Sequence, residues 1–144
     1  MNKVIAIGGD HAGFAYKEKI VRKLEEEGFE VKDFGPFSED SVDYPDFAHP
    51  LSDFVESNSG THGILICGSG NGVAITANKH ANIRAALCWN TEVAALSRQH
   101  NNANILCIPA RFVAIETAEE MVDVFMETAF EGGRHGTRVN KISC

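Results

Sequence analysis

The sequence of 144 residues lacks a long apolar run of the kind that spans a membrane or forms the core of a secretory signal. Its first apolar run begins at Val4 and is soon broken by Gly8 and Gly9. Cysteine is scarce, and none of the four cysteines forms a C-x-x-C pair. We therefore expect a cytoplasmic protein with reduced thiols and without a membrane partner.

Basic residues are few in the first part of the chain. Residues 1–60 contain 13 acidic and 6 basic residues, and the net charge of the whole chain is −7. This balance argues against nucleic acid as a partner. Only six arginines occur, and four of them follow residue 97: Arg98, Arg111, Arg134 and Arg138. They indicate a specific anion site, although pairing of each arginine with the acidic first half is an equally good interpretation.

The chain also lacks the complete dinucleotide-binding fingerprint G-x-G-x-x-G. Two glycine clusters approach it: Gly8, Gly9 and Gly13, and Gly68, Gly70 and Gly72. The first cluster has the wrong spacing, the second continues with Val73 instead of Gly or Ala, and no Walker lysine follows either. Asp33 at the end of a predicted strand resembles a ribose-binding acid, so a nucleotide-binding Rossmann domain stays open as a minority alternative.

Histidine offers no metal-binding framework in the sequence. The six histidines contain no i, i+4 pair and no zinc-type spacing with cysteine, so we expect no metal site. His49, His62 and His80 have no obvious partners along the chain, and we expect them at the surface.

The apolar pattern alternates between strands and helices. Strands are predicted over residues 4–7, 29–34, 63–67, 84–88 and 104–108. Helical stripes lie between the strands and after the last one, where Thr117 and Glu120 form a predicted capping box. Parallel strands need crossover helices that cover both sheet faces. We therefore expect an α/β fold with one domain over residues 1–144, a three-layer α/β/α sandwich with a five-stranded parallel Rossmann-like sheet, and a tail over residues 131–144.

Polar residues follow the carboxyl ends of the predicted strands, where ligands bind in such folds. Asp10 and His11 follow the first strand, Cys67 opens a glycine-rich loop after the third, and Arg111 follows the fifth. A helix N-terminus would make Cys67 a reactive thiolate, whereas apolar burial would make it inert. Asp10 and the neighbouring His11 suit contact with sugar hydroxyls or phosphate, and a helix N-cap is the alternative for Asp10. His100 ends a predicted helix, whose C-terminus favours a protonated imidazole suited to acid–base work.

Six motifs occur in order along nearly the whole chain: Gly9-Asp10-His11-Ala12-Gly13, Asp43-Tyr44-Pro45, Cys67-Gly68-Ser69-Gly70-Asn71-Gly72, Ala77-Asn78-Lys79, Ser97-Arg98-Gln99-His100-Asn101 and Glu131-Gly132-Gly133-Arg134-His135. Together they resemble the type B ribose-5-phosphate isomerases and the wider family that includes galactose-6-phosphate and allose-6-phosphate isomerases. The ordered set is far more specific than any single motif. The resemblance implies a cofactor-free aldose–ketose isomerase of the non-oxidative branch of the pentose phosphate pathway.

The resemblance also assigns roles to residues of this chain. Cys67 would take the C2 proton of the opened sugar, giving a cis-enediolate whose oxyanion Ser69 and the loop amides would hold. His100 would assist ring opening, and Asp10 would manage protons at O5 or O1. The residues implied in binding the sugar are Tyr44, Asn101, Gly68, Gly70, Asn71, Gly72 and Val73. The residues implied in binding the phosphate are His11, Arg111, Arg134 and Arg138.

Two positions depart from parts of the family. Ser69 stands where some members carry threonine, and both side chains supply a hydroxyl. One branch lacks the cysteine and places a glutamate directly after the glycine loop, where this chain has Val73. The resemblance further implies a homodimer, or a dimer of dimers, with an active site built from two chains.

Two other functions stay open at this point. An enzyme of the same family with a longer pocket would act on a hexose phosphate such as galactose 6-phosphate or allose 6-phosphate. A non-catalytic sugar-phosphate or nucleotide-binding module would keep the phosphate arginines without a need for Cys67. The turnover of five- and six-carbon sugar phosphates, and the effect of replacing Cys67, separate these functions.

Overall fold

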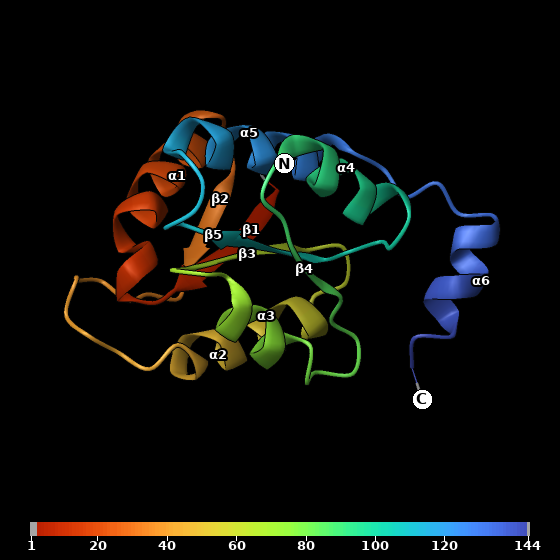
Figure 1. Cartoon of the computed structure of the whole chain (residues 1–144), viewed down its shortest axis with the longest axis horizontal. Coiled ribbons are helices and arrows are strands. Elements are labelled where there is room, and N and C mark those ends of the chain that lie inside the picture. Colours follow the sequence, from red (N-terminus) through yellow and green to blue (C-terminus); the bar gives the residue numbers. More distant parts are fainter. Residues whose placement is uncertain (1–2, 144) are drawn as a thin grey trace.

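The computed structural model describes residues 3–143 as a parallel β-sheet between two layers of helices (Figure 1). The strands are β1 Val4–Gly9, β2 Glu30–Asp33, β3 His62–Cys67, β4 Ala85–Leu87 and β5 Ile105–Pro109. The helices are the 3-10 turn η1 His11–Gly13, α1 Phe14–Glu26, α2 Pro45–Ser57, α3 Asn71–Ala77, α4 Thr91–Gln99, α5 Ile115–Glu127 and α6 Arg134–Asn140. The expected α/β/α sandwich is confirmed. None of these helices has the length and apolar character needed to cross a bilayer.

The strand order is β2-β1-β3-β5-β4, and every neighbouring pair is parallel. β5 therefore lies between β3 and β4, although it follows both along the chain. The register places Gly9 beside Ile66, and Cys67 beside Pro109. The carboxyl ends of β1, β3 and β5 consequently meet at one edge of the sheet, and the loops that follow these strands lie together.

The strands divide their side chains between two apolar cores. Ile64 and Ile66 belong to the core beneath α1, α4 and α5, whereas Leu65 and Cys67 belong to the core beneath α2 and α3 (Figure 1). This division follows from the two-residue period of a strand. Because helices cover both faces, β3 is apolar along almost its whole length. Cys67 thus extends the second core up to the edge of the sheet.

The start of α5 differs from the sequence expectation. The helix begins at Ile115 with Ala114 as its N-cap, so the capping box predicted from Thr117 and Glu120 is wrong. Val113 and Ile115 pack against the core and fix the start of the helix before Thr117. No side-chain hydrogen bond caps this end.

The predicted tail contains a helix that the apolar pattern did not indicate. This helix, α6, stands apart from the sandwich in Figure 1. Gly132 and Gly133 precede it with φ angles of 72° and 59°. This left-handed backbone turns the chain, so that α6 does not continue the direction of α5. His135 is the buried residue of α6, so the helix leaves most of its surface exposed.

Candidate active site

The carboxyl edge of the sheet carries a cavity of about 450 Å³. Its lining residues are Asp10, His11, Ala12, Tyr44, Cys67, Gly68, Ser69, Gly72, Arg111 and Phe112. Backbone hydrogen bonds hold the loops together, from Asp10 N–H to Ile66 O at 3.1 Å and from Arg111 N–H to Gly68 O at 3.0 Å. The sequence predicted no role for Phe112 or Ala12. The signals for them were their position after a strand end and, for Ala12, its place in the first of the six motifs.

Cys67 has both of the environments that the sequence left open. Its side chain is 5% exposed and packs in the core beneath α2 and α3. Its Sγ also accepts a hydrogen bond from the Gly70 N–H at 3.1 Å. Gly70 has a φ of 77°, a left-handed conformation that glycine adopts without strain and that turns its N–H toward the sulfur. The sulfur thus has a backbone hydrogen-bond donor, although it belongs to the apolar core.

Two other cysteines lack such a donor and are deeply buried. Burial raises the pKa of Cys88 to about 11. Burial raises the pKa of Cys107 well above its ordinary value, and the neighbouring Cys67 and Cys88 make smaller contributions in the same direction. Both therefore remain neutral thiols at physiological pH. None of these three cysteines forms a disulfide in the part of the chain that the structure describes.

Of the four backbone amides from Gly70 to Val73, two are available to an anion. The Gly70 N–H is taken by the sulfur, and the Asn71 N–H donates to Ser69 Oγ at 3.3 Å. The N–H groups of Gly72 and Val73 have no acceptor within residues 3–143. These amides open α3, where the first turn has no acceptors of its own. Of the amides expected to hold an oxyanion, Gly72 and Val73 are the free ones.

Tyr44 and Arg111 lie directly over glycines of the same loop. A Cβ at Gly72 would be 2.6 Å from Tyr44 Cζ. At this distance any residue other than glycine would force the tyrosine ring to move. A Cβ at Gly68 would be 3.1 Å from Arg111 Nε. The phenol and the guanidinium therefore flank the cavity at the loop that carries Cys67.

Asp10 and His11 are both held by backbone groups. Asp10 Oδ1 accepts the Ala12 N–H at 3.0 Å and so caps η1, which confirms the N-cap interpretation. Its Oδ2 has no hydrogen-bond partner among residues 3–143 and is left for a ligand. His11 Nδ1 accepts the Val42 N–H at 3.2 Å, so the proton of the neutral ring lies on Nε2.

The other predicted site residues lie at the opposite edge of the sheet. His100 and Asn101 follow α4, just before β5 begins. Arg134 and Arg138 lie on α6, whose His135 stacks on His100. A strand rises about 3.3 Å per residue, so the length of β5 alone separates the two edges by roughly 15 Å. Within one chain, the two groups of residues do not meet.

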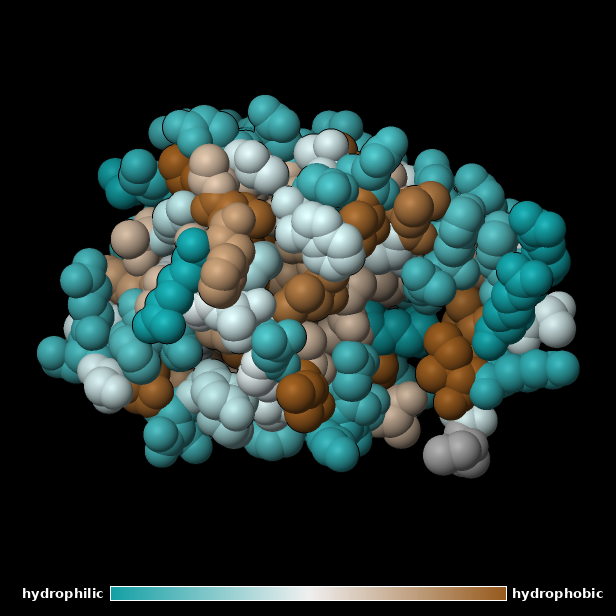
Figure 2. Space-filling model, in the orientation of Figure 1, coloured by the Kyte–Doolittle hydropathy of each residue, from teal (hydrophilic) through white to brown (hydrophobic). Residues whose placement is uncertain are grey.

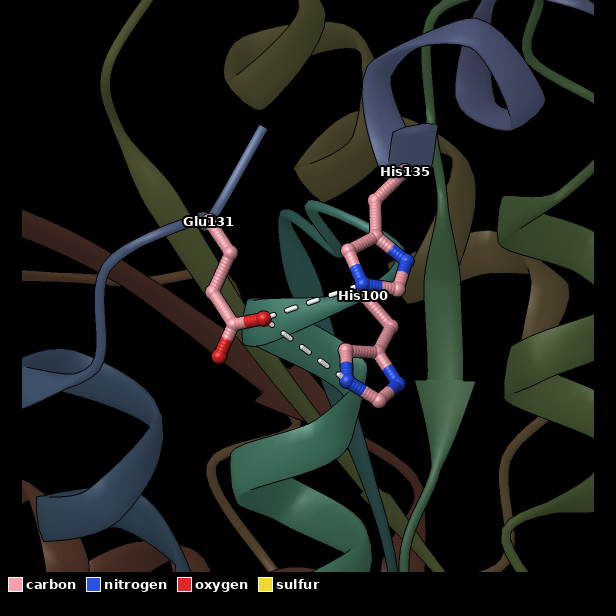
Figure 3. A group of neighbouring side chains, drawn as sticks. All are labelled: His100, Glu131 and His135. Carbon is pink, nitrogen blue, oxygen red and sulfur yellow. Dashed lines mark ion pairs between the residues drawn. The ribbon is translucent and has the colours of Figure 1, made fainter. Parts of the chain in front are cut away.

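His100, Glu131 and His135 form a polar cluster at this second edge (Figure 3). The two rings are stacked with centroids 4.2 Å apart and an interplanar angle of 10°. Glu131 Oε1 points between them, 3.9 Å from His100 Nε2 and 3.7 Å from His135 Nε2. Partial burial, and then the charge of His100, lower the pKa of His135. The sequence did not predict this group, because α5 separates its members along the chain.

Of the three histidines expected at the surface without partners, His49 is exposed as predicted, but His62 and His80 are partly buried, and His49 and His80 have partners. His49 Nδ1 is 2.8 Å from His80 Nε2. His80 Nδ1 is in turn 3.2 Å from Asp53 Oδ1 and 3.8 Å from Glu56 Oε1. His62 is largely buried in β3. His80 and its two carboxylates, like the cluster of Figure 3, offer three potential metal ligands, which the fold gathers from positions without a ligand spacing in the sequence.

The fold and the cavity together define a class of protein: an α/β sandwich with a cavity at the carboxyl edge of a parallel sheet, where such folds bind ligands, lined by a thiol and basic side chains. The chain belongs to the family described as Ribose/Galactose Isomerase, which matches residues 5–142. The resemblance drawn from the six motifs is confirmed.

Relatives of known name are similar over almost the whole chain. Ribose-5-phosphate isomerase B of Escherichia coli strain K12 is 45% identical over 141 residues, which cover 98% of this chain and 95% of that protein. The crystal structure of a ribose 5-phosphate isomerase from Thermotoga maritima superimposes with a TM-score of 0.96 at 48% identity, covering 99% of each chain. Ribose-5-phosphate isomerase B from Mycoplasma genitalium with bound ribulose-5-phosphate gives a TM-score of 0.94 at 45% identity, covering 99% of this chain and 95% of that one.

Proposed function

We propose that the chain interconverts ribose 5-phosphate and ribulose 5-phosphate as a cofactor-free aldose–ketose isomerase. Membership of the family supports isomerisation, and the bound ribulose-5-phosphate of the Mycoplasma genitalium relative supports a pentose phosphate. The observation that carries the proposal is the Cys67 Sγ, which accepts the Gly70 N–H at 3.1 Å in a cavity that Arg111 also lines. A thiol that shares a cavity with a guanidinium suits proton abstraction from a phosphorylated sugar.

The reaction needs a base and a place for the charge that develops. Cys67 as thiolate removes the C2 proton of open-chain ribose 5-phosphate and returns it to C1 through a cis-enediolate. The amides of Gly72 and Val73 and the hydroxyl of Ser69 hold the oxyanion, and one such donor lowers the barrier by roughly 3 to 4 kcal/mol. Asp10, through its free Oδ2, moves hydroxyl protons at O1 or O5.

The second half of the site comes from another copy of the chain. The residues at the far edge of the sheet are His100, Asn101, Arg134 and Arg138. In this arrangement His100 opens the sugar ring, and the two arginines share the phosphate with His11 and Arg111. A homodimer, alone or paired into a dimer of dimers, sets the far edge of one copy over the cavity of the other. Residues 131–144 then act as the phosphate-binding and interface tail of the single domain.

The surface supports self-association. Several large apolar side chains are exposed in the single chain: Phe37, Ile75, Trp89, Phe112 and Ile142. Phe112, 75% exposed, stands at the mouth of the cavity, and Ile142, 59% exposed, follows α6. Figure 2 shows two groups of apolar side chains on one face, one in the middle and one at the position of α6. Burial of both patches between two copies would stabilise the pair.

The compartment follows from the thiols. A base that must be a free thiolate, together with two further unpaired cysteines, suits a reducing cytoplasm better than an oxidising compartment. We therefore place the enzyme in the cytoplasm.

Proton NMR of ribose 5-phosphate in heavy water, with the purified protein and without added metal or nucleotide, tests the function. We expect ribulose 5-phosphate to appear with solvent deuterium in the sugar, and Cys67→Ala to lower the rate at least about 100-fold. The matched control is Cys88→Ala, which removes a thiol outside the cavity.

The same experiment distinguishes the alternatives. Turnover of galactose 6-phosphate or allose 6-phosphate, without turnover of ribose 5-phosphate, would show that the substrate is a hexose phosphate. Binding of these sugars without any conversion by the folded protein would leave a non-catalytic module. A Cys67→Ala rate near that of the unaltered chain would remove the thiol from the role of base.

A further inference from the structure

A second polar cavity, of about 440 Å³, lies at the edge of the sheet where β3 and β5 begin. Its basic groups are Arg84, Arg98 and His62, and we name it the basic cavity. The other lining residues are Val55, Glu56, Ser59, Gly60, Thr61, Asn82, Asn102 and Asn104. It shares no lining residue with the cavity beside Cys67, so an inference about it stands independently of the proposed activity.

The two guanidiniums of the basic cavity are fixed by the chain and keep unused donors. Arg98 is 8% exposed, and it donates from Nε to Thr128 O at 3.1 Å and from Nη1 to Ala103 O at 2.6 Å. Arg98 Nη1 also donates to Asn102 Oδ1 at 2.9 Å, while Arg84 Nε donates to Asn102 O at 2.9 Å. The Nη2 of Arg98 and both Nη atoms of Arg84 have no acceptor within residues 3–143. Fixed, unused donors of this kind are preorganised for a ligand.

Within the described chain, the basic cavity is lined by two arginines and by one carboxylate, that of Glu56. No carboxylate of residues 3–143 forms an ion pair with either arginine. Glu56 lines the cavity, but its Oε2 accepts the Asn82 N–H at 2.7 Å. Burial and then the charge of Arg84 lower the pKa of Arg98. Like charges held together in a partly buried space repel one another, and an anion between them would relieve that repulsion.

His62 lines the same cavity and carries an unsatisfied polar atom. Its Nδ1 is buried and has no hydrogen-bond partner in residues 3–143. Burial lowers the pKa of His62 to about 4, and Arg98 and Lys3 act in the same direction. The ring is therefore neutral at physiological pH beside the two guanidiniums, and its signals would report on an anion bound between them.

We propose that the basic cavity binds a phosphate group, either free phosphate or the head of a small phosphate monoester, between Arg84, Arg98 and His62. The planar guanidinium forks match two oxygens of a tetrahedral oxyanion, and two arginines match its double charge. The cavity is larger than one phosphate ion, which leaves room for the organic part of a monoester beside Ser59 and Thr61. A ligand bound to the two arginines would also stabilise the backbone of Asn102, which has a φ of 48° and follows His100 by two residues.

NMR of the histidine side chains during phosphate titration tests the proposal, because His62 and His11 report on the two cavities separately. His62→Gln assigns the His62 signal. With sodium phosphate at constant ionic strength, we expect the His62 signal to move and saturate, and the pKa of His62 to rise. In Arg84→Gln, the same movement should require at least about tenfold more phosphate, while the response of His11 stays unchanged. Arg22→Gln, an exposed arginine on α1, is the matched control and should behave like the unaltered chain.

Further titrations decide between the sources of the phosphate group. Tighter binding of glycerol 3-phosphate than of phosphate would identify a monoester, and equal binding would identify the free ion. Arg84→Lys keeps the charge without the fork, and an intermediate affinity is expected if Arg84→Gln does not fold. The proposal is overturned if His62 stays unmoved while His11 saturates, if Arg84→Gln and Arg84→Lys both respond like the unaltered chain, or if chloride alone gives the same movement.

Discussion

The chemistry of single residues in this chain depends on one or two contacts. Cys67, Cys88 and Cys107 are all nearly inaccessible, at 5%, 0% and 0% exposure. Only Cys67 accepts a backbone N–H at the sulfur and lines a cavity. Burial raises the pKa values of the other two thiols, which keeps them protonated and unreactive.

Iodoacetamide should therefore inactivate the enzyme by alkylating Cys67. Ribose 5-phosphate should slow the loss of activity because it fills the same cavity. Peptide mass spectrometry at partial inactivation locates the label, and Cys88→Ala should be inactivated at the unaltered rate. Loss of activity that tracks label on Cys144 alone, which lies outside the described residues, would contradict the assignment.

The burial of His62 predicts a pH dependence of stability. Its pKa falls to about 4 in the folded chain from 6.5, so the unfolded chain binds more protons between these values. The stabilisation is complete above pH 6.5 and is lost as the pH falls toward 4. Allowing for screening by water, the loss is about 2 kcal/mol of unfolding free energy. Urea unfolding at several pH values should show this slope, and His62→Gln should flatten it, whereas the exposed His49→Gln should not.

At this scale the sequence predicted positions better than environments. Asp10, Cys67 and Arg111 were placed at one edge because apolar strands end just before them. The surroundings of His62 were missed, since its ring packs on Phe125 of α5, far along the chain. Whether Cys67 is buried or reactive was also undecided, because the answer depends on the direction of the Gly70 N–H.

Among the elements, the loop between β3 and α3 has little space beside its glycines. Gly72→Ala would put a methyl group 2.6 Å from Tyr44 Cζ. Tyr44 is 39% exposed and can move away, so we expect the free energy of unfolding to change by less than about 1 kcal/mol. The displaced phenol should lower kcat/KM about tenfold. Gly8→Ala, whose methyl group would meet its neighbours at 3.4 Å, is the control, and equal losses in both variants would refute the role of Tyr44.

The junction of α1 and β2 depends on a buried ion pair. Lys17 is 1% exposed, and its Nζ lies 2.8 Å from Asp33 Oδ2. Asp33 Oδ1 accepts the Gly35 N–H at 2.9 Å and so fixes the turn that follows β2. The acid that suggested a nucleotide-binding site is therefore already occupied by Lys17.

Removal of one partner of this pair should be worse than removal of both. Lys17→Met should lower the unfolding free energy by about 2 to 3 kcal/mol because Asp33 is left without its counter-charge. Lys17→Met with Asp33→Asn should recover part of that loss. Chemical denaturation of the four proteins of this double-mutant cycle gives the coupling, and strictly additive effects would show that the pair contributes no coupling.

Most helices and strands were predicted from the spacing of apolar residues. The features that this spacing missed have physical causes. The five strands and the helices between them follow strong local patterns, whereas the place of β5 between β3 and β4 has no local signal. α6 packs little on the rest of the chain and has few apolar residues, so it carries no apolar stripe from which a helix could be predicted. The early start of α5 results from core packing of Val113 and Ile115.

For the molecule as a whole, the predicted site is divided between two edges of one sheet. This division predicts complementation between two inactive variants. Cys67→Ala and His100→Ala chains, refolded together in equal amounts, should regain about a quarter of the unaltered activity, because half of the pairs are mixed and each mixed pair has one intact site. Each variant alone should be almost inactive. No recovery, in mixtures shown to contain the mixed pair, would place the whole site within one chain.

In the proposed two-chain site, the separation of the two edges also makes activity depend on concentration. Side chains cannot bridge roughly 15 Å of sheet by changing rotamer, so a lone copy that is perfectly folded would still be a poor catalyst. Dilution below the dissociation constant of the pair should lower the specific activity, while far-ultraviolet circular dichroism of the chain stays the same. Such an enzyme responds to its own abundance, and its rate per chain rises as more of it is made.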